Sequence, residues 1–155
     1  MPTRKFETAS VDEVLKHCVV DVPESGPAKP VTEIRQRRTI IVVDDEFVIA
    51  DTLVAILNQS GFSALAAYDG ESAFELISAR VPDLLITDIC MPGMNGIELA
   101  IRVRKHFSSC KVLLFSGHAA STNLIDEART SGYEFDFLSK PVHPRDLLER
   151  LNRAA

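Results

Sequence analysis

Short apolar runs alternate with segments of helically spaced apolar residues along most of the chain. The run TIIVV at 39–43 is β-branched and almost wholly apolar, which is typical of a strand buried on both faces. Apolar residues then recur at helical spacing from Ile49 to Leu57, and Ser60-Gly61 is a sequence that commonly ends a helix. This part of the pattern predicts a buried strand followed by a helix.

The same pattern recurs along the rest of the chain. Further predicted strands are SALAA (63–67), LLIT (84–87), KVLLF (111–115) and FDFL (135–138). Further predicted helices cover 71–80, with Asp69 as N-cap, and the stretches around 97–107, 124–131 and 147–151. Strands that alternate with helices form a parallel sheet, so we expect an α/β fold with a doubly wound, five-stranded sheet and helices on both faces.

Residues 1–38 do not follow this pattern, and we interpret them as an N-terminal extension to a domain at 39–155. Apolar positions at helical spacing, with a capping-box pair at their start, predict a short amphipathic helix over 11–20. The proline-rich VPESGPAKP that follows is typical of a linker. A helix of this length is unstable alone in water, so its apolar stripe either docks on a protein surface or stays disordered.

Composition and charge indicate a soluble globular protein of one domain. The chain has 155 residues, of which 46% are hydrophobic and 25% charged. The net charge of −5 disfavours binding to nucleic acid or to an anionic membrane. No apolar run reaches the length of about 18 residues that spans a membrane, and the N-terminus lacks the apolar core of a secretory signal. Cysteines without metal-ligand spacing indicate free thiols, so we expect a cytoplasmic protein without membrane insertion.

Polar side chains stand where most of the predicted strands end. Asp44 and Asp45 follow the first strand, Asp88 the third, Ser116 the fourth and Lys140 the fifth. An isolated aspartate at a strand end is usually a turn residue or a helix cap. In a parallel sheet, however, the carboxyl ends of the strands meet at one edge, and ligands bind there. We therefore expect these side chains to converge on one site.

The three carboxylates at this edge would repel one another unless a cation lay between them. Two unit charges about 5 Å apart repel by roughly 3 kcal/mol at an effective dielectric constant of about 20. Hard oxygen ligands in small number, completed by water, suit Mg²⁺, which commonly serves phosphoryl groups. Lys140 and Ser116 can then contact phosphoryl oxygens, and an aspartate can accept a phosphoryl group covalently.

Sequence motifs at these strand ends resemble those of one family. They are VVDDE (42–46), DICMPGMNG (88–96), LLFSG (113–117) and FLSKP (137–141). Each motif is weak alone, but all occur in order and at consistent strand ends. The domain thus resembles a response-regulator receiver domain, the phosphoacceptor part of two-component signalling. The resemblance implies a flavodoxin-like (βα)5 fold with strand order 2-1-3-4-5.

The resemblance implies that Asp88 is the phosphorylated residue. It also implies that Asp44 or Asp45, together with Asp88 and the backbone carbonyl of Cys90, holds Mg²⁺. Such a protein is not a conventional enzyme, because it catalyses only its own phosphorylation and dephosphorylation.

The resemblance assigns further residues to sensing the phosphoryl group. Ser116 is the expected switch hydroxyl. Lys140 is expected to contact the phosphoryl group, and the Lys140-Pro141 peptide bond is expected to be cis. Phe137 is the expected aromatic residue that rotates as Ser116 moves, with Phe135 as the alternative.

Loop residues and partners complete the expectation. Cys90, Met91 and His118 are expected to flank the pocket, where Cys90 and His118 would set the lifetime of the acyl phosphate. The implied phosphodonor is a histidine kinase or a phosphotransfer protein. The chain has no room for an output domain, so we expect it to signal through a downstream protein, with a second copy of the chain as another candidate partner.

Rival functions make different demands on the sequence. An Mg²⁺-dependent phosphohydrolase with an aspartate nucleophile usually has a second acid two residues further on, where this chain has Cys90. A nucleotide-binding domain needs glycines after its first strand, and DDEFV has none. A receiver that binds partners independently of phosphorylation would not need Asp45, Asp88, Ser116 and Lys140 together, yet all are present.

Overall fold

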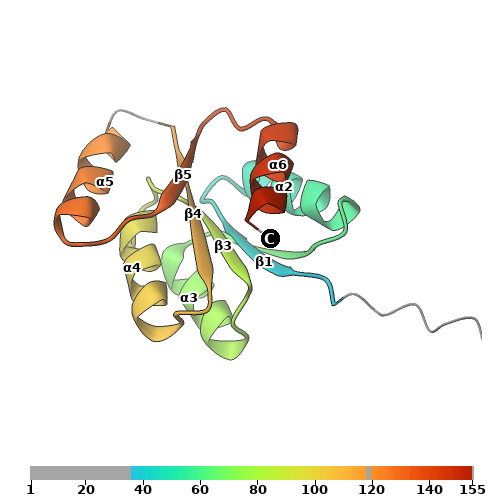
Figure 1. Ribbon diagram of the computed structural model, residues 1–155, viewed down its shortest axis with the longest axis horizontal. Coiled ribbons are helices and arrows are strands. Elements are labelled where there is room, and N and C mark those ends of the chain that lie inside the picture. The colour runs from blue at the N-terminus through green and yellow to red at the C-terminus, as the bar shows by residue number, and fades with distance from the viewer. Residues whose placement is uncertain (1–35, 118–119, 155) are drawn as a thin grey trace, which may run out of the picture. The chain divides into compact units, whose positions relative to one another are not determined.

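The structure is a computed structural model that describes residues 36–117 and 120–154 (Figure 1). The helix expected over 11–20, the linker after it and His118 lie outside these residues. The division of the chain at residue 38 therefore stays a prediction. Within the described residues, no helix is long and apolar enough to cross a bilayer.

Strands and helices alternate throughout the described part of the chain. The strands are β1 (Thr39–Val43), β2 (Ser63–Ala67), β3 (Leu84–Asp88), β4 (Lys111–Ser116) and β5 (Asp136–Ser139). The helices are α2 (Phe47–Gln59), α3 (Gly70–Ala79), α4 (Gly96–His106), α5 (Ala120–Thr130) and α6 (Pro144–Arg153). Every strand and helix predicted within these residues is present, with ends that differ by a few residues.

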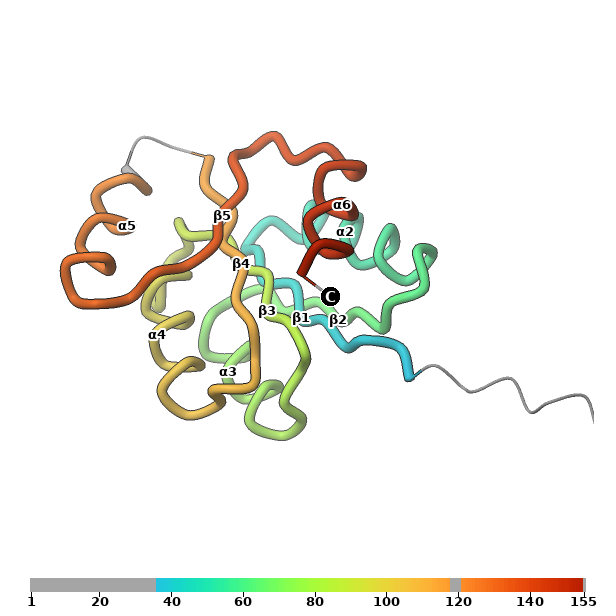
Figure 2. The backbone as a smooth tube through the Cα atoms, viewed as in Figure 1, coloured from blue at the N-terminus to red at the C-terminus, as the bar shows by residue number. Residues whose placement is uncertain are grey.

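The strands form one parallel sheet, whose order is β2-β1-β3-β4-β5 (Figure 2). The α/β fold class and the strand order expected from the resemblance are thus confirmed. The central strands β1 and β3 are neighbours, with Val43 paired to Thr87. This register brings the residues that follow Val43 next to Asp88.

Two apolar cores lie on the two faces of the sheet. Alternate residues of a strand point to opposite faces, so Ile41 packs with residues of α3 and α4, while Ile40 packs with residues of α2 and α6. Figure 1 shows α2 and α6 together on one side of the sheet, with α3 and α4 on the other. Burial on both faces explains why TIIVV has no polar alternation.

Local sequence accounts for several helix ends. Asp69 is the N-cap of α3, as predicted, and its side chain accepts a hydrogen bond from the Ser72 backbone N–H. Gly61, just past α2, has a φ of 94°, a conformation that glycine adopts without steric cost. Asn95 and Glu98 form a capping box at the start of α4.

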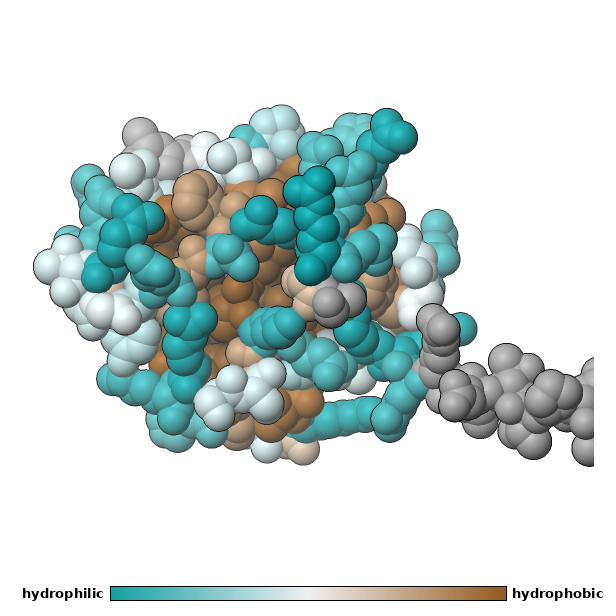
Figure 3. All heavy atoms as spheres, viewed as in Figure 1, coloured by the Kyte–Doolittle hydropathy of each residue, from teal (hydrophilic) through white to brown (hydrophobic). Residues whose placement is uncertain are grey.

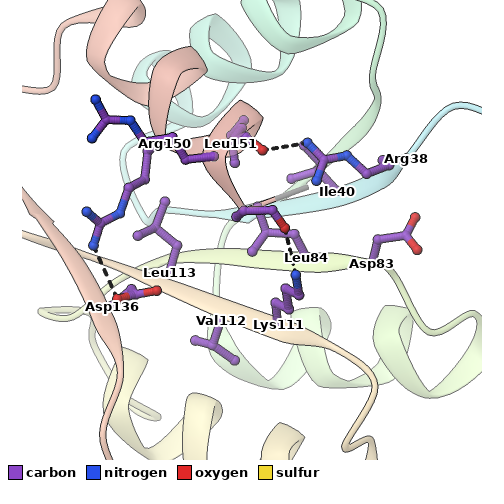
Figure 4. A pocket seen from close by; sticks show the side chains of 12 residues that line it. Arg38, Ile40, Asp83, Leu84, Lys111, Val112, Leu113, Asp136, Arg150 and Leu151 are labelled. Carbon is purple, nitrogen blue, oxygen red and sulfur yellow. Dashed lines mark hydrogen bonds and ion pairs between the residues drawn. The ribbon is translucent and has the colours of Figure 1, made fainter.

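The end of α6 borders a cavity of about 320 Å³ at the amino ends of β1, β3 and β4 (Figure 4). Arg38 donates to the Leu151 carbonyl at 2.7 Å, and Lys111 donates to the Ala154 carbonyl at 2.6 Å. Leu151 lies in the last turn of α6 and Ala154 is its C-cap, and cations are favourable partners of the carbonyls at this end of a helix. In Figure 3, apolar surface lies in the middle of the view, where Figure 1 shows β4 and β5, and hydrophilic side chains surround it.

Leu99 lies on α4 with 0% of its surface exposed, so its truncation should leave a cavity against the sheet. We expect Leu99→Ala to lower the free energy of unfolding by about 2–5 kcal/mol in a urea titration. Leu65 on β2 is a matched control, because its side chain is 60% exposed. Leu65→Ala should cost less than about 0.5 kcal/mol. Equal losses in the two variants would contradict the described packing.

Candidate functional site

The structure brings together three carboxylates that the sequence predicted to converge. Asp44 and Asp45 follow β1, and Asp88 ends the neighbouring strand β3. One carboxylate oxygen of each lies within 4.8 Å of the others. Asp44 and Asp88 are buried, whereas Asp45 is exposed. The site is therefore a set of oxygen donors at the carboxyl edge of the sheet, open to solvent on the side of Asp45.

Lys140 supplies the positive charge of this site. Its Nζ lies 2.8 Å from Asp44 Oδ2 and 3.4 Å from Asp88 Oδ1. The backbone N–H of Lys140 donates to the Ser116 carbonyl at 2.8 Å, which ties the end of β5 to the end of β4. The Lys140-Pro141 peptide bond is cis, so this prediction is confirmed.

Burial and charge shift the protonation of these groups in different directions. Burial raises the pKa of Asp88 above its usual value; the nearby Lys140 opposes the shift, and Asp44 adds to it. Burial of Lys140 alone would lower the pKa of its ammonium group. Its interactions with Asp44 and Asp88 outweigh this effect, and the pKa of Lys140 is raised. One ammonium group lies among three carboxyl groups, so an additional cation would reduce the repulsion between the carboxylates.

The chemistry of the donors fits a hard divalent cation. Carboxylate oxygens are ligands that Mg²⁺ prefers, and Mg²⁺ commonly takes only one or two carboxylates and keeps several waters. The exposed side of Asp45 leaves room for such waters. The carboxylates are also close enough to one another to share one ion. The residues present therefore fit the Mg²⁺ site that the sequence predicted.

Close approach of the backbone at Gly96 helps to build the site. A Cβ atom at this position would collide with the backbone carbonyl of Asp88. The Gly96 N–H also donates to the Ile89 carbonyl at 2.9 Å. The sequence motif thus has glycine here because α4 begins against the residue that ends β3.

The predicted loop residues have distinct surroundings. Cys90 is exposed, and its Sγ lies 3.4 Å from Ser121 Oγ on α5. Met91 is buried in the apolar core between the sheet and α4. Ser121 was not predicted, although it shares the helical spacing of Leu124 and Ala128. A polar residue on that apolar face was the available signal.

The predicted switch residues lie on the last two strands. Ser116 ends β4 and is half-buried. Phe137 lies within β5, pairs with Leu114 and is 44% exposed. Phe135 precedes β5, where it stacks on Tyr133 with ring centroids 6.2 Å apart. Rotation of either phenylalanine stays a prediction.

Residues 40–152 match the response regulator receiver domain family, and the chain therefore belongs to this family. A CheY-like receiver domain protein from Methanospirillum hungatei is 29% identical, with a TM-score of 0.70, over 76% of this chain and 93% of that one. The chemotaxis protein CheY4 from Vibrio cholerae is 26% identical, with a TM-score of 0.66, over 77% of this chain and 99% of that one.

A longer protein also contains a similar domain. NtrX from Brucella abortus is 32% identical, with a TM-score of 0.67, over 76% of this chain. The match covers 26% of the NtrX chain. A similar domain thus occurs both in chains that it nearly fills and as one part of a larger chain.

The raised pKa of Asp88 has a consequence for stability. Because the folded-state pKa lies above the ordinary value of 3.8, the ionised carboxylate opposes folding. This penalty is absent below the ordinary pKa and is complete once the pH has risen past the raised value. Asp88→Asn should therefore increase the free energy of unfolding near pH 7, and the gain should disappear toward about pH 3. Thermal unfolding of both proteins as a function of pH, without divalent cations, measures this gain in stability.

A matched control for this measurement is Glu75→Gln, which neutralises an exposed carboxylate on α3. We expect it to change stability little at any pH, because exposed single charges contribute little. Equal stability of Asp88→Asn and the unsubstituted protein near neutral pH would show that the Asp88 carboxylate carries no such penalty.

Proposed function

We propose that the protein is a phosphoacceptor response regulator. In this proposal, Asp88 takes a phosphoryl group from a histidine kinase or a phosphotransfer protein in the presence of Mg²⁺. The observation that carries the proposal is the carboxylate cluster at the strand ends, with Lys140 2.8 Å from Asp44 and 3.4 Å from Asp88. Membership of the receiver family supports the same function.

The proposed reaction forms an acyl phosphate. An oxygen of Asp88 attacks the phosphorus of the donor phosphohistidine. The P–N bond then breaks, and the imidazole nitrogen keeps the electron pair. Water later cleaves the acyl phosphate and regenerates the carboxylate. The protein would therefore catalyse only its own phosphorylation and dephosphorylation.

The remaining site residues prepare for the charge of the phosphoryl group. Asp44, Asp45, Asp88 and the Cys90 carbonyl would hold Mg²⁺, which supplies positive charge to phosphoryl oxygens. The Lys140 ammonium is already within reach of Asp88, so it can turn to a phosphoryl oxygen there. The Ser116 hydroxyl would donate a hydrogen bond to another phosphoryl oxygen.

Output is proposed to occur through protein contacts in the cytoplasm. Movement of Ser116 toward the phosphoryl group would let Phe137 follow, because the two residues lie on adjacent strands. The exposed fraction of Phe137 means that such a rotation changes the surface formed by α5, β5 and α6. A downstream protein or a second copy of the chain would bind to this surface when it changes.

An apolar groove beside the site is a surface that a bound phosphodonor protein would cover. Its volume is about 550 Å³, and Ile49, Leu53 and Ile56 of α2 line it together with Lys140 and Pro141. Val48 at the start of α2 is 79% exposed. A donor that delivers phosphate to Asp88 would lie next to this apolar groove.

Phosphorylation of the protein by acetyl phosphate and Mg²⁺ tests the assignment of Asp88. Intact mass measurement should show one added phosphoryl group, because the carboxylate can attack a small phosphodonor without a partner protein. Asp88→Asn should add none. Asp126→Asn is the control, because it removes an exposed carboxylate on α5, and it should be phosphorylated normally. Uptake by Asp88→Asn equal to that of the unsubstituted protein would move the phosphoacceptor elsewhere.

A further inference from the structure

Ser121 is a polar residue at a position that helix geometry gives to the core. It lies in the first turns of α5 and has 0% of its surface exposed. Leu124, Ile125 and Ala128 follow at the spacing of the same helix face and pack toward the apolar core. A buried hydroxyl costs free energy unless it finds a hydrogen-bond partner. The hydrogen-bond partner of the Ser121 hydroxyl therefore influences where the first turns of α5 pack on the domain.

That partner is Cys90, in the loop that follows β3. The two atoms, Ser121 Oγ and Cys90 Sγ, are 3.4 Å apart, although the residues are 31 positions apart in sequence. Either atom can be the donor. Within the described residues, this contact is also the one hydrogen bond of Cys90. Ile89, in contrast, is held on both sides by backbone hydrogen bonds to Phe115 and Gly96.

The helix α5 borders two cavities and buries few of its side chains. A cavity of about 480 Å³ lies between α5, β4 and the segment before β5, and another of about 210 Å³ lies between α4 and α5. Of the side chains described on α5, only Ser121 and Ala128 are buried. Fewer packing contacts make a displacement less costly, and one polar contact then has a larger share in fixing the start of the helix.

We propose that Ser121 is a positioning residue for the metal and phosphoryl site. Its hydroxyl holds Cys90, and thereby the Cys90 carbonyl, in the place that suits a cation shared with the carboxylates. The same contact makes the start of α5 respond when the site is filled. This inference rests on the proposed function, because it takes the Cys90 carbonyl as a ligand of Mg²⁺.

Thermodynamic linkage gives the proposal two readouts. If the contact stabilises the geometry that binds Mg²⁺, then Mg²⁺ must stabilise the contact by the same factor. Ser121→Ala should weaken Mg²⁺ binding about two- to tenfold, the range expected for one neutral hydrogen bond. In the unsubstituted protein, Mg²⁺ should slow amide hydrogen exchange in the first turns of α5. In Ser121→Ala, this slowing should be smaller.

A double-mutant cycle separates the contact from general effects on packing. Mg²⁺ affinity is measured for Ser121→Ala, Cys90→Ala and the double variant, with MgCl₂ as the only added ligand. If the two side chains act through one contact, the double variant loses no more affinity than either single variant. Thr122→Ala is the control, because Thr122 is exposed on the same turn, and it should bind Mg²⁺ normally.

Each contrary outcome identifies what fails. Normal Mg²⁺ affinity and a normal exchange response in Ser121→Ala would overturn the role of Ser121 and leave the proposed function intact. Losses that simply multiply in the double variant would likewise overturn it, because the two residues would then act independently. Absence of Mg²⁺ binding by the unsubstituted protein would overturn both this inference and the proposed metal site.

Discussion

Repulsion between carboxylates at the ends of two neighbouring strands is the constraint on which the site depends. Parallel pairing of β1 with β3 places Asp44 and Asp45 beside Asp88, so the fold itself concentrates negative charge at this edge of the sheet. Asp44 is 1% exposed, and a buried carboxylate without a partner is costly. Lys140, which directly follows β5, provides that partner from across the intervening strands β3 and β4. The ion pair therefore links the middle of the sheet to its edge strand.

The central strands that carry the carboxylates are tightly packed, whereas the residues after β5 and at the start of α5 reach the site through side-chain contacts. Packing on both faces fixes β1 and β3, and Gly96 lets α4 begin against the Asp88 carbonyl. The elements on the other side of the site are held differently. After β5, Lys140 contacts Asp44, and at the start of α5 Ser121 contacts Cys90. A change in charge at Asp88 would act first on these side-chain contacts, because the backbone of the central strands is tightly packed.

Much of the fold could be predicted because strand and helix periodicities are properties of neighbouring residues. The buried run at β1, the cap at Asp69 and the polar strand ends are all visible locally, and the parallel sheet rule brings the strand ends together. The contact between Ser121 and Cys90 could not be predicted in this way. It depends on how α5 is rotated and how far it lies from the loop after β3, and neither quantity is written in a local pattern. The same holds for the preference of Lys140 for Asp44 over Asp88, which is set by differences of tenths of an ångström.

The central claim is that the carboxylate cluster is built to share a divalent cation, and an NMR titration with MgCl₂ tests it most directly. We expect saturable shifts of the backbone amides around Asp44, Asp45 and Asp88, together with a rise in thermal stability, because the cation relieves the repulsion between the carboxylates. Substitution of Asp45 by Asn should weaken the binding without unfolding the protein, since this side chain is exposed. Amide shifts that do not change near these residues, in a folded protein at millimolar Mg²⁺, would contradict the account.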